Sequence, residues 1–366
     1  MNISDGERTG ARAGNETART GARPAIIGHR GASGYRPEHT AAAYRLAFAL
    51  GADAVEPDIV ATRDGVLVIR HDAEISATTD VASRPEFAHL RATKEIDGVP
   101  LTGWFTEDFT WDQLATLRAV ERLGALRPIS ASFDGEYPIL RMRDLFALTD
   151  EGAARHGRPL GIVAEIKHAT YFESIGLPLD ELFAAEASEA GWSNASTLVV
   201  ESFEKTILGK LARRGLSADW IYLIESHGAP ADRVARDGAA ARSYDEDVSD
   251  AGLIALAAEE AGVGVNGVSV DLSRILIAGP DGEPSVSDLP ARAGAFGLQT
   301  YCWTLRPENA FLSAGFRRGT VEADLGDWRR EFELVLGSGV VAVFADHPDL
   351  AVAVRDGMDP QEQRRA

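Results

Sequence analysis

The chain has 366 residues, and its 37 basic and 56 acidic side chains give a formal net charge of −19. This acidic excess argues against a nucleic-acid or anionic-membrane partner, because proteins that coat phosphates do so with Lys and Arg. With 45% hydrophobic and 25% charged residues, the composition is that of a globular protein with a real core. A small anionic substrate stays compatible with the net charge, since a local site can oppose it.

The two ends of the chain lack the patterns of folded or membrane segments. Residues 1–24 are rich in Gly, Ala, Arg, Thr and Glu and contain no apolar run. A secretory signal needs roughly 7–15 apolar residues and a membrane span about 20, and neither pattern occurs. We therefore expect a disordered tail over 1–24, a flexible tail over 357–366 and a cytoplasmic protein. The single cysteine, Cys302, excludes an intrachain disulfide and argues against a thiolate zinc site.

From residue 25 onward, short Val- and Ile-rich runs alternate with helical patterns. In chain order, they predict strands over 25–28, 54–61, 66–70, 162–166, 197–200, 220–224, 268–272, 298–303 and 340–344. Helices are expected over 38–50, 179–190, 203–214 and 327–336. Repeated strand–helix units imply parallel strands with right-handed crossovers. About eight parallel strands and one extra strand favour a (β/α)8 TIM barrel over an open sheet. A Rossmann-type sheet is also disfavoured, because no glycine-rich dinucleotide loop follows the first strand.

Two segments do not follow this alternation of strands and helices. Residues 73 to about 140 are mostly polar, with a short helix expected over 112–120 and aromatic residues between Trp104 and Trp111. We expect this segment to be an insertion packed over the C-terminal face of the strands, within a single barrel domain over 25–356. Residues 226 to about 250 are expected to form loops.

Polar side chains gather at the predicted strand ends, which face the active site in a TIM barrel. The first strand ends in His29-Arg30-Gly31. Histidine can move protons near neutral pH, and arginine makes two-pronged contacts with phosphate. A second histidine, His71, follows a later strand, and the adjacent Asp72 could orient a neighbour. Two histidines facing one cavity would supply a general base and a general acid.

Carboxylates recur on the same strands. Glu56 and Asp58 are two residues apart and therefore point to the same side of a strand. Glu165 and Lys167 repeat this arrangement. Burying unpaired carboxylates would cost several kcal/mol, which a cation such as Mg²⁺ or Ca²⁺ would offset. Ion pairs with Arg or Lys are the alternative for each carboxylate.

Further residues lie at strand or helix ends and are ambiguous alone. Glu38 lies in the first turn of a predicted helix, where it could simply favour the helix dipole. Ser202, Phe203 and Trp303 follow strands, where packing or capping is the simpler interpretation. Together with the histidines and carboxylates, however, they predict a metal-dependent phosphoryl-transfer site.

The ordered motifs resemble the glycerophosphodiester phosphodiesterase family over about residues 25–355. The resemblance rests on His29-Arg30-Gly31, Pro37-Glu38-His39-Thr40, Glu56-Pro57-Asp58, His71-Asp72, Glu165-Ile166-Lys167, Ser202-Phe203, Trp303 and Asp346. The segment Gly103–Thr110 resembles the longer bacterial branch of that family. Two departures stand out: His39, where the family usually has Asn, and Ala345-Asp346-His347, where Thr usually precedes the Asp.

The resemblance implies a TIM barrel that hydrolyses glycerophosphodiesters to glycerol 3-phosphate and an alcohol. It implies His29 and His71 as the acid/base pair and Glu56, Asp58 and Glu165 as metal ligands. It further implies phosphate and substrate contacts from Arg30, Lys167 and Trp303, supported by Glu38, Ser202 and Phe203. The metal would be calcium, with magnesium as the alternative, and His39 would support its loop.

Two other functions are compatible with the same motifs. A lysophospholipase D-like enzyme would act on lysolipids, and an exposed apolar lip between Trp104 and Trp111 would support it. A barrel that binds phosphate without catalysis is the other alternative, although such a site need not keep every histidine and carboxylate. The motifs do not specify the head group of the substrate.

Overall fold

The computed structural model describes residues 23–258, 264–279 and 283–357. The predicted tails over 1–24 and 357–366 therefore lie almost entirely outside the described residues. In the described part of the chain, no helix is long and apolar enough to cross a membrane.

Eight parallel strands form a closed barrel, as predicted. The sheet closes because β2 pairs with both β1 and β7, while the remaining neighbours follow in the order β1, β14, β13, β10, β9, β8, β7. The strands are β1 (Ala25–His29), β2 (Ala54–Glu56), β7 (Gly161–Ile166), β8 (Leu198–Ser202), β9 (Asp219–Ile224), β10 (Gly267–Asp271), β13 (Gln299–Leu305) and β14 (Ala342–Ala345).

The predicted extra strand is also present. β3 (Asp58–Ala61) continues β2 beyond Pro57 and pairs with β7, and β4 (Leu67–Ile69) runs antiparallel to it. This hairpin extends the barrel wall and places His71 just beyond the end of β4. A separate antiparallel pair, β11 (Leu276–Ala278) and β12 (Pro284–Val286), lies outside the barrel sheet.

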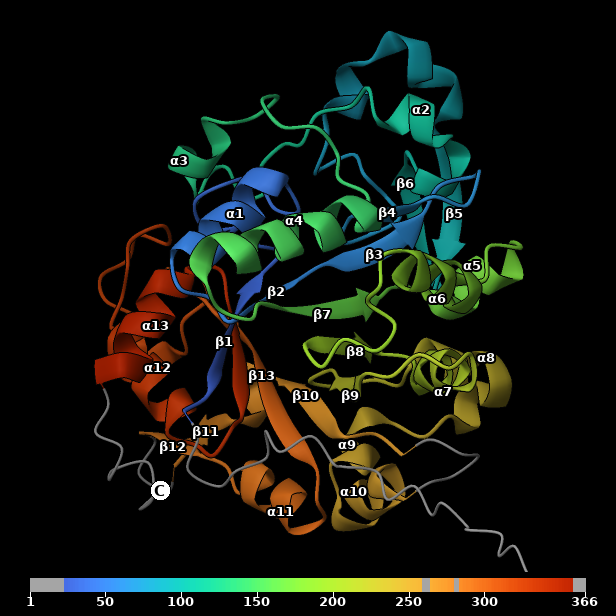
Figure 1. Ribbon diagram of the computed structural model, residues 1–366. Helices are drawn as coiled ribbons and strands as arrows, with labels where there is room; N and C mark the ends of the chain where they lie inside the picture. The colour runs from blue at the N-terminus through green and yellow to red at the C-terminus, as the bar shows by residue number, and fades with distance from the viewer. Residues whose placement is uncertain (1–22, 259–263, 280–282, 358–366) are drawn as a thin grey trace, which may run out of the picture.

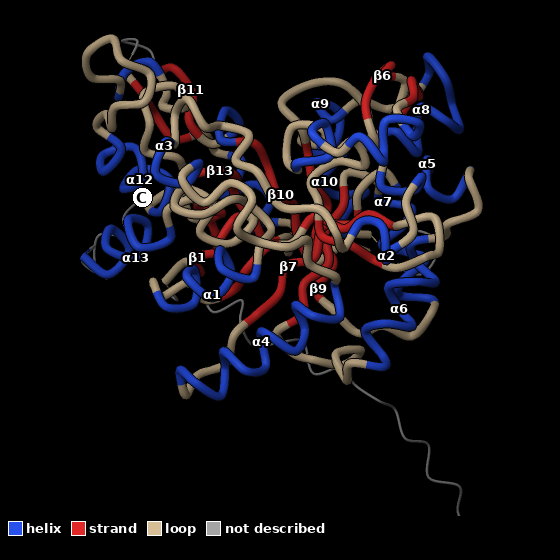
Figure 2. Tube along the Cα trace, turned by 90° about the horizontal axis from the view of Figure 1, so that it is seen from above, coloured by secondary structure: helices blue, strands red, loops and turns tan. Residues whose placement is uncertain are grey.

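Helices surround the strands on the outside (Figures 1 and 2). They are α1 (Ala41–Ala49), α4 (Met142–His156), α5 (Ala169–Ser174), α6 (Leu179–Glu189), α7 (Lys205–Arg213), α8 (Ala231–Asp237), α9 (Tyr244–Asp247), α10 (Asp250–Ala257), α11 (Leu289–Ala295), α12 (Trp328–Leu336) and α13 (Pro348–Gly357). Alternate strand residues face opposite ways. One small apolar cluster, which includes Ile27, Val163 and Ile221, is thus separate from the large cluster beneath the helices.

The helix predicted over 38–50 starts later than expected. Thr40 is its N-cap, because its hydroxyl accepts a hydrogen bond of 3.1 Å from the Ala43 amide, and α1 begins at Ala41. Glu38 therefore precedes the helix, and the idea that it favours the dipole of the first turn is wrong.

The insertion contains more local structure than expected. The strands β5 (Ala92–Ile96) and β6 (Val99–Gly103) form a hairpin, and α2 (Trp111–Leu114) and α3 (Pro128–Ala131) follow. Figure 1 shows these elements along one side of the barrel. The helix predicted over 112–120 is wrong beyond Leu114, because Arg118 and Ala119 form bridges to Pro138 and Thr79 instead.

The loop predicted over 226–250 is also wrong, because α8 and α9 occupy much of it. At α9 the missed signal is local: Ser243 and Glu246 form a reciprocal capping box. Both helices are too short to show a clear apolar period.

Candidate active site

A cavity of about 840 Å³ opens at the C-terminal ends of the barrel strands. It brings together nine of the eleven predicted site residues: His29, Arg30, Glu56, His71, Glu165, Lys167, Ser202, Phe203 and Trp303. The other two, Glu38 and Asp58, are buried beside Arg30 and contact its guanidinium. The motifs therefore converge in three dimensions, although they span most of the sequence.

Three buried carboxylates converge at the inner end of this cavity. Glu56, Asp58 and Glu165 each offer an oxygen, and these three oxygens lie within 4.8 Å of one another. One oxygen of each carboxylate has no hydrogen-bond partner among the described residues, although Lys167 Nζ lies 2.9 Å from Glu165 Oε1. Buried oxygens that repel one another and lack donors fit a hard divalent cation.

The pKa values of these carboxyl groups reflect the same crowding. Burial, followed by the charge of Asp58, raises the pKa of Glu56 well above its usual range. Burial also raises the pKa of Glu165 to about 8, even though Lys167 opposes the shift. Without a cation, burial and mutual repulsion thus favour the protonated forms of Glu56 and Glu165, and a bound cation would displace those protons.

Asp58 is fixed in place by a buried histidine. His39 Nε2 lies 2.8 Å from Asp58 Oδ2, and His39 Nδ1 lies 2.8 Å from the Tyr44 hydroxyl. A neutral His39 that donates from Nε2 and accepts from the tyrosine satisfies both contacts. His39 therefore orients a carboxylate of the cluster directly, which goes beyond the loop-supporting role expected of it.

His29 is oriented by an aspartate across the barrel. Its Nδ1 lies 2.6 Å from Asp346 Oδ1, at the end of β14. Burial, together with the neighbouring Arg30, lowers the pKa of His29 to about 3. The ring is therefore neutral at pH 7, donates from Nδ1 to Asp346 and keeps Nε2 as an acceptor.

Two arginines that the sequence did not suggest hold Asp346. Arg127 Nη2 and Arg306 Nε each donate to Asp346 Oδ2 over 2.7 Å, and Arg127 Nε donates to Glu308 over 2.7 Å. Burial alone would raise the pKa of Asp346, but Arg306 and Arg127 outweigh it and hold that pKa well below its usual range. Nothing near Arg127 in the sequence marks it, because its partners lie about 180 and 220 positions away.

His71 has an equivalent partner in Asp72. Its Nδ1 lies 2.7 Å from Asp72 Oδ2, as the adjacent carboxylate suggested. Burial, followed by Arg30 and Lys167, lowers the pKa of His71 to about 4. The missed residue here is His168, whose Nε2 lies 3.8 Å from Asp72 and whose Nδ1 lies 2.6 Å from Asp97 in the β5–β6 hairpin.

The two cationic side chains are both held by carboxylates. Arg30 Nη1 lies 3.2 Å from Glu38 Oε2 and Arg30 Nε lies 3.2 Å from Asp58, while Lys167 contacts Glu165. Arg122 of the insertion also donates to Glu38, over 2.7 Å. Glu38 thus positions Arg30 at the cavity wall. The ion pairs given above as the alternative are present, yet they leave the three carboxylate oxygens without hydrogen bonds.

The remaining predicted residues shape the wall of the cavity. The Ser202 hydroxyl donates to the Ile166 carbonyl over 2.8 Å and accepts from the Glu204 amide, so it ties β8 to β7. The rings of Phe203 and Trp303 pack edge to face at 5.9 Å, and Trp303 Nε1 is buried without a partner among the described residues.

The aromatic stretch of the insertion is not an exposed lip. Phe105 and Phe109 are fully buried, and the Trp104 indole donates to the Phe87 carbonyl over 2.7 Å. The feature that would have supported a lysolipid substrate is therefore absent from this segment.

The fold and the cavity define the class of protein: a TIM-barrel enzyme whose strand ends combine two oriented imidazoles with a carboxylate cluster and two basic side chains. The sequence profile of the glycerophosphoryl diester phosphodiesterase family matches residues 29–350. A glycerophosphodiester phosphodiesterase of Arabidopsis thaliana is 30% identical over 312 residues, or 81% of this chain and 78% of the plant protein. The chain belongs to the glycerophosphoryl diester phosphodiesterase family.

Solved structures share the fold. A Silicibacter pomeroyi protein assigned as a glycerophosphoryl diester phosphodiesterase superposes with a TM-score of 0.62 at 18% identity, over 92% of this chain and 94% of that chain. An Oleispira antarctica phosphodiesterase, in complex with the product sn-glycerol-3-phosphate, gives a TM-score of 0.54 at 18% identity, over 92% and 98% of the two chains.

Proposed function

We propose that this protein hydrolyses glycerophosphodiesters to glycerol 3-phosphate and an alcohol. The observation that carries the proposal is the cavity itself, because two oriented histidines line it together with the carboxylate cluster. Membership of the family supports the same activity. No feature of the described residues favours lysolipids as the substrate.

The two imidazoles are arranged for proton transfer. Each donates from Nδ1 to an aspartate, so each presents Nε2 as the free nitrogen. In the proposed reaction one histidine takes the proton of the attacking oxygen, which belongs either to water or to the glycerol hydroxyl beside the phosphate. The other histidine, protonated as the phosphodiester anion binds and raises its pKa, donates to the leaving alcohol.

Arg30 and Lys167 are proposed to hold the phosphate. Both line the cavity and both are nearly buried, so their charges act in a poorly screened environment. Glu38 would keep Arg30 in position, Trp303 would contact the substrate, and Ser202 and Phe203 would support the wall around it.

Glu56, Asp58 and Glu165 are proposed to hold a divalent cation, which would stabilise negative charge on the phosphoryl oxygens. We propose calcium, with magnesium as the alternative, because all three ligands are hard carboxylate oxygens and the resemblance to the longer bacterial branch favours calcium. The single-domain organisation with an insertion over 73–140 and the cytoplasmic location also stay predictions, which limited proteolysis and cell fractionation would test.

The test is release of glycerol 3-phosphate from a panel of glycerophosphodiesters, measured with a coupled enzyme. The assay is run with EDTA and then with Ca²⁺ or Mg²⁺ added back. We expect turnover that EDTA abolishes and one cation restores. Turnover of no member of the panel under any metal condition would reject the activity, and turnover insensitive to EDTA would reject the cation site.

A further inference from the structure

The cavity extends well beyond the groups assigned to the reaction. Figure 1 shows the β5–β6 hairpin, α5 and α8 one below another along the right-hand side of the barrel. Residues of this hairpin and of α5, α8 and α9 line the outer part of the cavity. We call this part the outer cavity. Its lining includes Glu95, Tyr171, Glu204, Glu225, Val234 and Tyr244. In the proposed reaction the leaving alcohol would occupy this space.

More carboxyl side chains than cationic side chains line the outer cavity. Its three glutamates, Glu95, Glu204 and Glu225, have no ion-pair partner within 4.0 Å in the part of the chain that the structure describes. The cationic groups nearby have partners: Lys167 contacts Glu165 and lies 5.6 Å from the centre of the Phe203 ring, and His168 contacts Asp97. Glu204 accepts hydrogen bonds from the Thr170 amide and hydroxyl, and Lys167 and His227 lie near Glu225, but none of the three glutamates forms an ion pair with a described residue.

Aromatic rings line the same space. Phe203 packs edge to face against Trp303 at 5.9 Å and against Tyr244 at 6.4 Å, so three rings form a continuous wall. A buried carboxylate stands behind them: Glu201 lines the cavity, is 1% exposed, and its Oε2 has no hydrogen-bond partner among the described residues. Ring faces attract cations, and quaternary ammonium ligands are recognised in this way.

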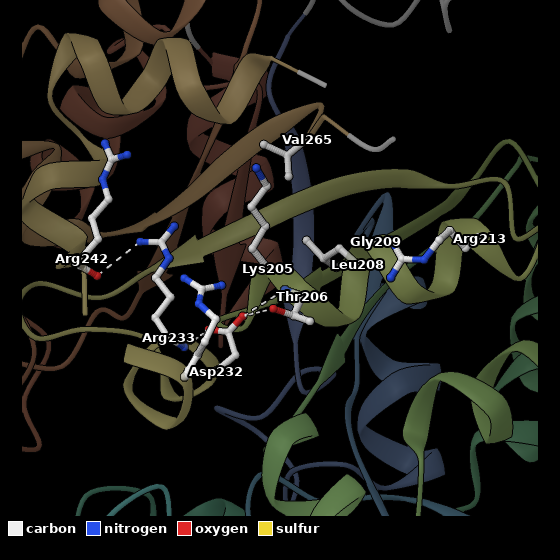
Figure 3. Close-up of a pocket in the computed structure, with 10 residues that line it drawn as sticks. Lys205, Thr206, Leu208, Gly209, Arg213, Asp232, Arg233, Arg242 and Val265 are labelled. Carbon is white, nitrogen blue, oxygen red and sulfur yellow. Dashed lines mark hydrogen bonds between the residues drawn. The ribbon is translucent and has the colours of Figure 1, made fainter. Parts of the chain in front are cut away.

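Helix α8, which forms one wall of the outer cavity, is fixed by contacts with α7. Figure 3 shows Asp232 of α8 reaching Thr206 in the first turn of α7. The Thr206 amide donates to Asp232 over 3.0 Å and the Thr206 hydroxyl over 2.6 Å. The far side of α8 faces a separate surface cavity lined by Lys205, Arg213, Arg233, Arg236 and Arg242 (Figure 3). The helix thus turns its basic side away from the outer cavity and its small and apolar side, with Ala231 and Val234, toward it.

We propose that the outer cavity is a subsite for a cationic head group, and that the protein prefers glycerophosphodiesters whose alcohol carries an ammonium or quaternary ammonium group. The inference rests on the proposed function, because it concerns the leaving group of that reaction. The carboxylates supply attraction, and the aromatic wall supplies contact area for the methyl or methylene groups around the nitrogen.

The test compares two substrates that differ in head-group charge, glycerophosphocholine and glycerophosphoglycerol. We expect kcat/KM to be higher for the choline ester in the wild-type protein. In Glu225→Gln and Glu95→Gln, which keep the side-chain shape and remove one charge, kcat/KM for the choline ester should fall about fivefold each, or roughly 1 kcal/mol, with little change for the glycerol ester. The matched control is Glu189→Gln, an exposed residue of α6 that makes the same change in net charge away from the cavity.

Two results separate failure of this inference from failure of the proposed function. If the wild type and both cavity variants turn over the two esters at the same ratio, or if Glu189→Gln changes the ratio as much, the subsite is rejected while the hydrolase remains. If neither ester is hydrolysed with metal present, the proposed function fails first. A further expected sign is loss of the preference at high salt, since partly exposed charges are screened.

Discussion

The barrel strands and the insertion contribute to the site in different ways. The strands, with the hairpin that extends them, present His29, Glu56, Glu165 and Lys167 directly to the cavity, and His71 follows that hairpin. The insertion lines the outer cavity with Glu95, and its other contacts reach residues behind these groups. Arg122 bonds to Glu38, Arg127 bonds to Asp346, and Asp97 bonds to His168.

This difference separates reaction from positioning. Strands that are paired on both sides hold a side chain rigidly, so reacting groups belong on them. The contacts of Arg122, Arg127 and Asp97 act through a second residue, and their loss is expected to cost less. The predictions below test that order, from the largest expected effect to the smallest.

The largest effect is expected from the two histidines. His29→Ala and His71→Ala should each lower kcat by about 10²-fold or more, because each removes one of the two proposed proton-transfer groups. Steady-state kinetics measures this loss, and His156→Ala, at an exposed position near the end of α4, is the control. Near-normal turnover in either variant would remove that histidine from the acid/base pair.

His39 should have the next largest effect, on cation affinity. His39→Ala removes the donor that orients Asp58, and changes of this kind weaken metal binding about 10- to 100-fold. Calorimetric titration with Ca²⁺ and with Mg²⁺ measures the change. His39→Gln, which can still donate, should restore part of the affinity, whereas equal affinity in wild type and His39→Ala would show that Asp58 needs no such partner.

A variant of Arg127 tests how much the insertion contributes to activity and stability. Arg127→Met leaves Asp346 with Arg306 as its remaining cation, so we expect kcat to fall about three- to tenfold, the scale of coupling within one network. The buried side chain also pairs with Glu308, so the free energy of unfolding should drop by about 3–5 kcal/mol in denaturant titrations. For Arg122→Met, whose side chain is 30% exposed, we expect a loss below about 1 kcal/mol. If Arg127→Met lowered kcat as much as His29→Ala does, the proposed difference between the barrel strands and the insertion would be wrong.

The smallest effect is expected in the β5–β6 hairpin, whose contact between Asp97 and His168 depends on pH. Burial opposes charging of His168, but Asp72 and Asp97 outweigh it and raise its pKa to about 9 from an ordinary 6.5. Because the folded-state pKa is the higher one, the anchor to Asp97 is complete below about pH 6.5 and is lost as the pH rises through about 9.

Hydrogen exchange of residues 92–103 measures this anchor. We expect protection in the hairpin to fall about tenfold between pH 6.5 and pH 10, beyond the intrinsic change of exchange rate. The variant His168→Gln should show the lower protection at both pH values. A hairpin whose protection is the same in wild type and variant would show that Asp97 contributes nothing there.

The barrel, and the convergence of the candidate site residues at its strand ends, could be predicted from the sequence because both depend on local patterns. Glu56 and Asp58 share a side of one strand, and Asp72 is the neighbour of His71, so spacing alone is informative. Partners far apart in sequence were missed, as Arg127 and Arg306 on Asp346 show, because no local pattern marks a pair that only folding brings together. His39 was visible as an unusual residue, yet its bond to Asp58 follows from a turn in which its φ is +61°.

Short helices were the other weakness. The prediction failed for α8 and α9 because a helix of one or two turns shows no period, and the helix over 112–120 stopped at Leu114 because tertiary bridges took over the next residues.

The central claim is that the strand ends hold a divalent cation on Glu56, Asp58 and Glu165. Calorimetric titration of the protein with Ca²⁺ at pH 7, in buffers of different ionisation enthalpy, tests it most directly. We predict one site per chain with release of protons, because the pKa values of Glu56 and Glu165 are raised without a cation, and a large loss of affinity in Glu165→Gln. Binding that releases no proton, or that is equally strong in Glu165→Gln, would contradict the claim.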